Sequence, residues 1–114
     1  MHELGIALHV MDTVEELAKE NELEHVYSVT LEIGEVSGVI FDYLADVWDW
    51  AANKRELFQG SKLLCETIPA ITYCRNCHKT YETVTYGRTC PYCQSPETEL
   101  AQGDELNIKE IEAL

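Results

Sequence analysis

Four of the five cysteines fall into two Cys-x-x-Cys pairs, and this pattern restricts the fold of the chain more than any other feature. The pairs are Cys74 with Cys77 and Cys90 with Cys93, separated by twelve residues. A two-residue gap lets both thiolates of a pair face one ion from a tight turn, and two such turns complete a tetrahedron of four thiolates. We therefore expect a structural zinc ion that holds a small ribbon folded. A filled shell of four thiolates leaves no open position, so this metal is not expected to catalyse a reaction.

Other uses of these cysteines fit the residues less well. Rubredoxin-like iron takes the same four thiolates, and the spacing does not exclude it. A redox dithiol needs only one pair, preferably at a helix N-terminus. Residues 74–78 also match a Cys-x-x-Cys-His haem-attachment string, but that interpretation requires an exported protein and leaves Cys90 and Cys93 without a role. The fifth cysteine, Cys65, lies in an apolar strand-like stretch and is expected in the core.

The net charge of the chain restricts the kinds of molecule that it can bind. Eight Lys and Arg against 21 Asp and Glu give a net charge of −13, which argues against nucleic-acid binding because phosphates must be met by cations. The charge is uneven along the chain. Residues 70–98 hold three cations and two carboxylates, a net of +1, while the remainder holds five cations and 19 carboxylates, a net of −14. This step in composition indicates two physically different parts.

The hydropathy pattern gives no sign of a membrane. No apolar run reaches the roughly 20 residues that a spanning helix needs. The first residues contain no basic stretch leading into an apolar one, so we expect no signal peptide. The expected location is the cytoplasm, with no membrane partner.

The first half of the chain has the apolar spacing of a helix followed by a strand. Residues 4–21 place apolar side chains on one broad arc, which indicates a helix packed against both a sheet and a second helix. That arc holds Leu4, Ala7, Leu8, Val10, Met11, Val14, Leu17 and Ala18. Residues 26–33 then alternate as a half-buried strand does. One face holds Val29, Leu31 and Ile33, and the other holds Ser28, Thr30 and Glu32.

The second half completes an α+β fold. Residues 41–51 follow helical spacing, with Trp48 in the apolar stripe and Trp50 outside it as a candidate partner contact. Residues 63–68 and 105–114 have the pattern of strands. We expect a small sheet packed with two helices, plus an inserted zinc ribbon.

The flanks and the composition of the insert set the expected domain boundaries. Residues 1–69 with 104–114 form an α/β domain, and residues 70–103 form the zinc-binding ribbon. Within the ribbon, residues 80–85 are expected to be a strand and residues 86–87 a turn. His78 directly follows a predicted zinc ligand and is either a pH-sensing neighbour of the thiolates or a solvated residue of the knuckle.

The first three residues form a second candidate metal site. A free amine at Met1, with the amide and imidazole nitrogens of His2, offers three nitrogen ligands in a plane. The amide or carboxylate of Glu3 closes a fourth position. Planar sets of this kind suit Ni(II) or Cu(II), not tetrahedral zinc. A histidine at position 2 is also common as an exposed residue of no consequence, so spacing alone leaves both interpretations open.

Several segments together are typical of one known family. They are residues 1–4 (MHEL) with residues 6–7, residues 29–35 (VTLEIGE), residues 36–39 (VSGV) and the two Cys-x-x-Cys pairs. With them the chain resembles, over essentially its whole length, the HypA/HybF hydrogenase maturation proteins. The family usually has Ser at the fifth residue, where this chain has Gly5, a change that leaves the candidate metal ligands untouched.

The resemblance implies a nickel metallochaperone that acts during assembly of [NiFe] hydrogenase. It places Ni(II), the transferable cargo, at Met1, His2 and Glu3, and the structural Zn(II) at the four paired cysteines. It also implies two partners, a HypB-type GTPase and the precursor of the hydrogenase large subunit. Some family members support urease maturation as well. Oligomeric state is not fixed by the residues or by the resemblance, and a homodimer stays open.

Two other classes of function compete with this one. A zinc-ribbon adaptor would bind a macromolecule through the ribbon, but a strongly basic ribbon would favour it and a net charge of +1 over residues 70–98 does not. An enzyme is not expected, because the sequence shows no nucleophile–base pair, no Gly-rich phosphate loop and no open catalytic metal site. Metal stoichiometry separates the first two classes, because a pure adaptor holds one zinc and ignores nickel.

Overall fold

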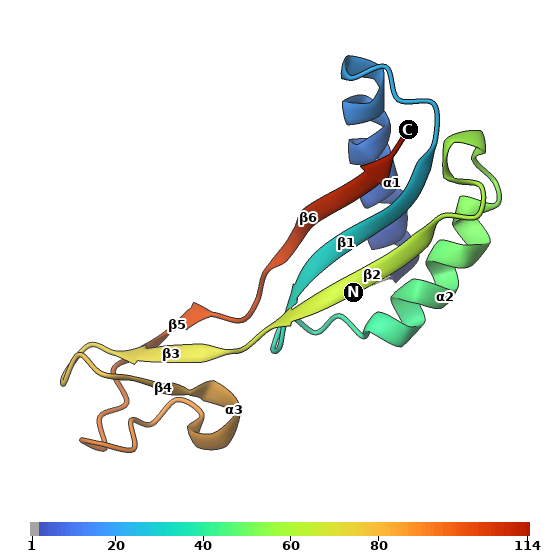
Figure 1. The fold of residues 1–114 in the computed structure, drawn as a ribbon. Coiled ribbons are helices and arrows are strands. Elements are labelled where there is room, and N and C mark those ends of the chain that lie inside the picture. Colours follow the sequence, from blue (N-terminus) through green and yellow to red (C-terminus); the bar gives the residue numbers. More distant parts are fainter. Residues whose placement is uncertain (1–2) are drawn as a thin grey trace. The chain divides into compact units, whose positions relative to one another are not determined.

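The computed structural model describes residues 3–114, and Met1 and His2 lie outside the described residues. The chain alternates helices and strands before it enters the ribbon and returns as a strand (Figure 1). The elements are α1 (Glu3–Glu20), β1 (Val26–Gly34), α2 (Phe41–Ala52), the 3₁₀ helix η1 (Glu56–Phe58), β2 (Lys62–Ile68), β3 (Ile71–Cys74), β4 (Thr80–Glu82), α3 (Thr83–Tyr86), β5 (Thr98–Gln102) and β6 (Leu106–Ala113). They form two three-stranded sheets, ordered β2-β1-β6 and β4-β3-β5. The predicted α+β fold class is confirmed.

The chain divides into two compact units. The first holds the chain up to residue 32 with residues 39–66 and 107–114, and the second holds residues 33–38 and 67–106. The domain boundaries expected from the sequence stay a prediction. Within the described part of the chain, no helix is both long enough and apolar enough to cross a membrane.

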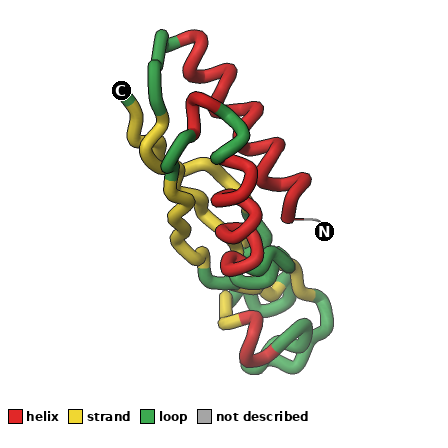
Figure 2. The backbone as a smooth tube through the Cα atoms, turned by 90° about the vertical axis from the view of Figure 1, so that its right-hand side faces the viewer, coloured by secondary structure: helices red, strands yellow, loops and turns green. Residues whose placement is uncertain are grey.

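Helices α1 and α2 cover one face of the first sheet (Figure 2). The core between them holds Met11, Val14, Leu31, Leu44, Trp48 and Phe58, all fully buried. Trp48 and Phe58 meet edge to face with their ring centroids 5.6 Å apart. Trp48 is therefore a core residue as predicted, and Trp50 is 58% exposed, also as predicted.

The buried stripe of α1 is narrower than the predicted arc. Leu4 and Leu17 were expected to be buried and are exposed, whereas Ile6 is buried. At 100° per residue, the buried positions of α1 span about 140°, and Leu4 lies just outside this arc. Leu17 lies within the arc but in the last turn of the helix. The sequence pattern indicated the correct side of the helix but overestimated the width of its buried stripe.

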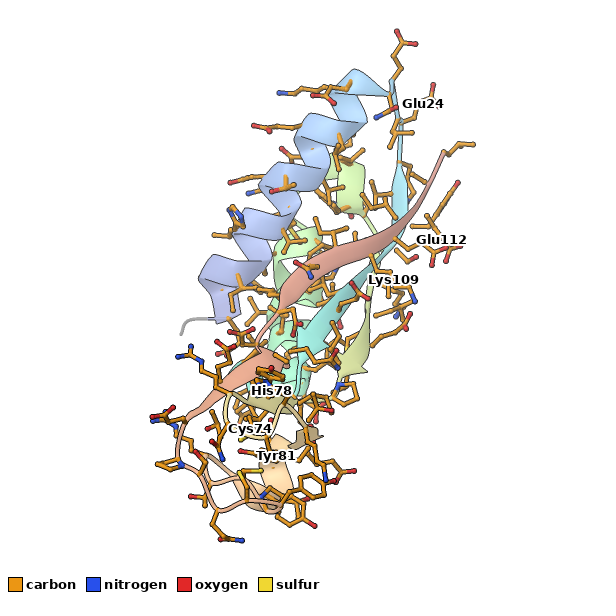
Figure 3. All side chains as sticks on the ribbon, turned by 90° about the vertical axis from the view of Figure 1, so that its left-hand side faces the viewer. Glu24, Cys74, His78, Tyr81, Lys109 and Glu112 are labelled. Atoms are coloured by element: carbon orange, nitrogen blue, oxygen red, sulfur yellow. The ribbon has the colours of Figure 1, made fainter. Side chains whose placement is uncertain are left out.

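The polar face of β1 is more buried than alternation predicts. Ser28 and Thr30 are each 8% exposed, and both lie on β1, the central strand of its sheet. The Ser28 hydroxyl donates to Glu112 Oε1 at 3.0 Å. Lys109 and Glu112 point away from α1 (Figure 3), and the Lys109 ammonium pairs with Glu66 of β2.

Two local predictions need correction, and one element was not predicted. The residues after β4, expected to continue as a strand, form the helical turn α3, which ends at Gly87 with φ +67°. The helix η1 was not anticipated, although its Phe58 is fully buried. Cys65, expected in the core, is only partly buried.

Candidate metal centre

The four paired cysteines converge in the second unit. Cys74 ends β3, Cys77 lies in the turn that follows, and Cys90 and Cys93 lie in the loop between α3 and β5. Their sulfur atoms all lie within 4.8 Å of one another. The Sγ atoms of Cys74 and Cys93 are 3.6 Å apart, as are those of Cys77 and Cys90. Tyr81 packs beside this cluster (Figure 3).

The two Cys-x-x-Cys turns repeat one backbone geometry. In the first turn the His78 N–H donates to the Cys74 carbonyl at 2.9 Å, and in the second the Gln94 N–H donates to the Cys90 carbonyl at 2.9 Å. His78 and Gln94 both take left-handed backbone angles, with φ of +64° and +65°. A non-glycine residue in this region is uncommon and costs energy. The matched conformation indicates that each turn is shaped to aim two sulfur atoms at one point.

Nitrogen donors surround the sulfur atoms. The Cys77 N–H lies 3.5 Å from Cys74 Sγ, and the Tyr92 N–H lies 3.4 Å from Cys90 Sγ. The side-chain amide of Asn76 donates to Cys93 Sγ at 3.4 Å. Such donors favour negative charge on sulfur, as a metal-bound thiolate requires.

Hydrogen bonds and burial give two of these thiols different pKa values. The Asn76 amide, with a backbone hydrogen bond at Ser95, lowers the pKa of Cys93 to about 6. A backbone hydrogen bond at Lys79 lowers the pKa of Cys77, but burial and the neighbouring sulfur atoms outweigh it and raise that pKa to about 11. Of these two thiols, Cys93 therefore loses its proton more readily than Cys77.

The sulfur geometry fits one tetrahedral metal ion. A Zn–S bond of about 2.3 Å places the sulfur atoms of a tetrahedron about 3.8 Å apart. The 3.6 Å separations are close to this value and far longer than the roughly 2.05 Å of a disulfide. The convergence of all four sulfur atoms also argues against a haem attachment that uses only the first pair. Cys74 ends a strand and does not begin a helix, so the geometry gives no support to a redox dithiol.

The ring of His78 does not reach toward the sulfur cluster. Its Nδ1 lies 2.6 Å from the hydroxyl oxygen of Tyr73, on an exposed part of the ribbon. Its backbone, by contrast, is part of the first cysteine turn. This backbone role was not predicted, because the sequence-based interpretation concerned the side chain alone.

The structure locates one of the three predicted nickel ligands. Glu3 is the first residue of α1, where a carboxylate is favoured by the positive end of the helix dipole. Met1 and His2 lie outside the described residues, so the predicted chelate stays a prediction.

Comparison with known proteins decides the family. Residues 1–113 match the family model described as "Hydrogenase/urease nickel incorporation, metallochaperone, hypA". The chain belongs to the HypA family. The resemblance noted from the sequence is thereby confirmed.

Individual relatives match along nearly their whole length. The hydrogenase maturation factor HypA of Actinobacillus succinogenes is 33% identical over 97% of each chain. HypA of Psychromonas ingrahamii is 34% identical over 98% of this chain and 97% of that protein. HybF of Morganella morganii is 30% identical over 98% of each chain.

Two solved structures share the fold. One is the solution structure of the Ni metallochaperone HypA from Helicobacter pylori, with a TM-score of 0.74, 22% identity and coverage of 100% of this chain and 98% of that one. The other, a solution structure of a HypA protein, has a TM-score of 0.76 and 21% identity, and covers 100% of this chain and 97% of that one. In the described residues of this chain, that fold holds the sulfur cluster described above.

Proposed function

We propose that this chain is a nickel carrier that binds Ni(II) at its N-terminus and releases it during maturation of [NiFe] hydrogenase. The observation that carries the proposal is the match of residues 1–113 to a family of nickel-incorporation metallochaperones. Relatives at 30–34% identity bear the name hydrogenase maturation factor and span the same length. The function is one of binding and transfer, without chemical turnover.

The proposed nickel ligands are the Met1 amine, the amide and imidazole nitrogens of His2, and Glu3. Strong nitrogen donors in a plane favour Ni(II) and Cu(II) in square-planar geometry. Glu3 adds a carboxylate in the first turn of α1. Copper competes for the same donors because its intrinsic affinity exceeds that of nickel. Selectivity must then come from metal availability or from the partner that supplies or receives the ion.

The proposed role of the second metal is structural. Zn(II) held by the four cysteines would close the ribbon and supply folding energy on the order of 10 kcal/mol. In this proposal, the part formed by residues 1–69 with 104–114 binds nickel, and residues 70–103 bind zinc. Rubredoxin-like iron is the alternative occupant, and elemental analysis of the purified protein distinguishes the two metals.

The proposed partners follow from the family. They are a HypB-type GTPase and the precursor of the hydrogenase large subunit, with urease maturation as a second process that family members serve. The proposed location is the cytoplasm. A homodimer stays an open alternative to a monomer.

A transfer experiment tests the proposal. The chain is loaded with one equivalent of nickel, mixed with purified large-subunit precursor with and without the GTPase, and separated from it. We expect nickel to move to the precursor while zinc stays with the chain. Nickel that remains on the chain in both mixtures, or zinc that leaves with it, would contradict the proposed roles. A chain that takes up no nickel would point to a zinc-ribbon adaptor.

A further inference from the structure

A cavity of about 580 Å³ opens on the second unit, separate from the sulfur cluster. Thr72 on β3 and Leu100 on β5 are paired in register and share a face of the sheet, so both line this cavity. None of the described residues that line it is a cysteine. Its volume lies in the range of small-molecule sites, about 300–1,000 Å³.

The floor of the cavity offers a hydrogen-bond donor. Thr72 is 4% exposed, and its hydroxyl oxygen lies 2.6 Å from that of Thr83. Each hydroxyl carries one proton, and only one of the two protons lies between the oxygens. Neither hydroxyl has another partner in the described part of the chain, so the second proton is free for a ligand. The ligand atom that meets it must be an acceptor.

The wall of the cavity holds a positively charged side chain that forms no ion pair with a carboxylate of the described residues. The chain has 21 Asp and Glu for eight Lys and Arg, and the other two arginines are both paired. Arg88, within residues 3–114, has no carboxylate at ion-pair distance. Its backbone is anchored, because the Thr98 hydroxyl donates to the Arg88 carbonyl at 2.7 Å. Arg88 is exposed, so its guanidinium is accessible to an external anion at the cavity.

Glu99 also lines the cavity, but its carboxylate does not form an ion pair with Arg88. Glu99 pairs with Arg75, whose Nη2 lies 2.8 Å from Glu99 Oε2. That pairing holds the pKa of Glu99 below its ordinary value. Arg75, which is not among the lining residues, thus balances the negative charge of Glu99. The charge that stays unpaired on the cavity wall is the positive charge of Arg88, which attracts an anion.

The remaining wall is apolar. Val36 and Leu100 are exposed although both are large aliphatic residues, and Pro96 lies beside them. An inorganic anion alone would leave these side chains in water. A ligand with an aliphatic stem next to its anionic group would cover them and gain from their burial.

We propose that this cavity binds an aliphatic carboxylate, with the carboxylate on Arg88 and the Thr72–Thr83 pair and the stem against Val36 and Leu100. The chemistry fits two sources, a free small carboxylic acid or the C-terminal residue of a partner polypeptide. The site does not depend on nickel binding and lies outside the nickel function proposed above.

Proton–nitrogen correlation spectra of the intact, zinc-loaded protein test this site. The probe is N-acetyl-leucine, added at millimolar concentrations, and the matched control is N-acetyl-leucine amide, which lacks the carboxylate. We expect saturable shifts at the amides of Thr72, Thr83, Thr98 and Leu100 with the acid. Comparable shifts with the amide, or none with the acid, would overturn the proposal.

Two charge-matched variants sharpen the test. Arg88→Gln should weaken binding of the acid about 10-fold or more, because it removes a charge-assisted hydrogen bond. Lys79→Gln removes the same charge from the same unit but not from the cavity, and should bind as the wild type does. Zinc content and unfolding temperature are measured for both. Equal loss of acid binding in the two variants would show that net charge alone causes the effect, and it would contradict the proposed site.

A peptide distinguishes the two sources. A five-residue peptide that ends in a free leucine carboxylate is compared with N-acetyl-leucine. Tighter binding of the peptide identifies a polypeptide C-terminus as the ligand. Equal or weaker binding identifies a free small acid. Binding of neither would overturn the proposal.

Discussion

Gly34, at the end of β1, lies so close to Gly103 that a Cβ on Gly34 would come within 2.1 Å of the Gly103 carbonyl oxygen. The N–H of Val36 donates to that same oxygen at 2.8 Å. Gly103 itself has φ +124°, and a Cβ there would meet Ala70 Cα at 2.5 Å. Three segments far apart in the sequence thus meet at backbone distance, and only glycine fits at two of the contact points.

Replacing Gly34 should strongly destabilise the protein. Gly34→Ala places a methyl group into backbone atoms that cannot rotate away, so we expect a loss of about 3 kcal/mol in the free energy of unfolding. Gly5→Ala is the control, because a methyl group added to Gly5 of α1 would meet nothing within 4 Å. Alanine there should gain about 0.5–1 kcal/mol through helix propensity. Urea unfolding measures both variants, and a neutral Gly34→Ala would contradict the close approach.

Loss of one cysteine of the cluster should release the metal. Cys90 is fully buried beside the other sulfur atoms, and Cys90→Ser leaves three thiolates that no longer close the shell. We expect zinc to fall well below one equivalent and the amide signals of residues 67–106 to collapse, while those of α1 and α2 persist. Cys65→Ser, outside the cluster, is the control and should keep the metal. Stoichiometric metal in Cys90→Ser would rule out the four-sulfur site.

The Asn76 amide should set how readily acid displaces the metal. It donates to Cys93 Sγ, and the pKa of this thiol, about 6, lies below its ordinary value of 9.0. A lowered pKa means that the thiolate form is favoured above about pH 6 and lost as the pH falls through that value. Asn76→Ala raises the pKa of Cys93, so protons should displace zinc at a higher pH, and zinc affinity should fall about 10-fold.

Gln94→Ala is the matched control for that experiment. Gln94 is also an exposed amide in a cysteine turn, but its side chain donates to the Pro91 carbonyl and not to sulfur. The pH midpoint of zinc release, followed with a chromogenic chelator, should move only in Asn76→Ala. An equal shift in both variants would show that the Asn76 hydrogen bond is not the cause.

Periodicity and spacing were enough to predict most of this fold. The stripe of α1, the alternation of β1 and the return of residues 105–114 as a strand each follow from residues close in sequence. The sulfur cluster was predictable for the same reason, since two residues between thiolates fix the turn. Trp48 and Trp50 were separated correctly because two residues along a helix turn the side chain by about 200°.

Features that depend on contacts between distant segments could not be predicted. Ser28 is buried because Glu112, 84 residues away, reaches over it. Arg88 stands out only once the structure shows which carboxylates the other arginines take. The sequence around Gly34 does not show that a side chain is excluded there, because the backbone atoms that exclude it belong to Gly103. The backbone match between His78 and Gln94, by contrast, follows from their equal offset of four from Cys74 and Cys90 and was available from the sequence.

His2→Ala should abolish tight nickel binding without affecting the fold. The side chain precedes the first residue of α1, so zinc content and unfolding temperature should stay at wild-type values. His9→Ala is the control, because His9 is an exposed histidine farther along the same helix. Both the amine and the imidazole must be unprotonated to bind, so wild-type affinity should fall as the pH drops from about 7.5 to 6. Unchanged nickel affinity in His2→Ala would exclude the imidazole as a ligand.

The proposed chelate depends most directly on the free amine of Met1. Extending the chain at its N-terminus converts that amine into an amide, which must lose a proton to bind and is a much poorer ligand. Nickel is titrated, with absorbance as the readout of coordination geometry, into the chain that starts at Met1 and into chains extended at the N-terminus or after Leu114. The free chain and the C-terminally extended chain should bind one nickel with a square-planar spectrum, and the N-terminally extended chain should bind far more weakly. Equal binding by all three would contradict the proposed nickel site.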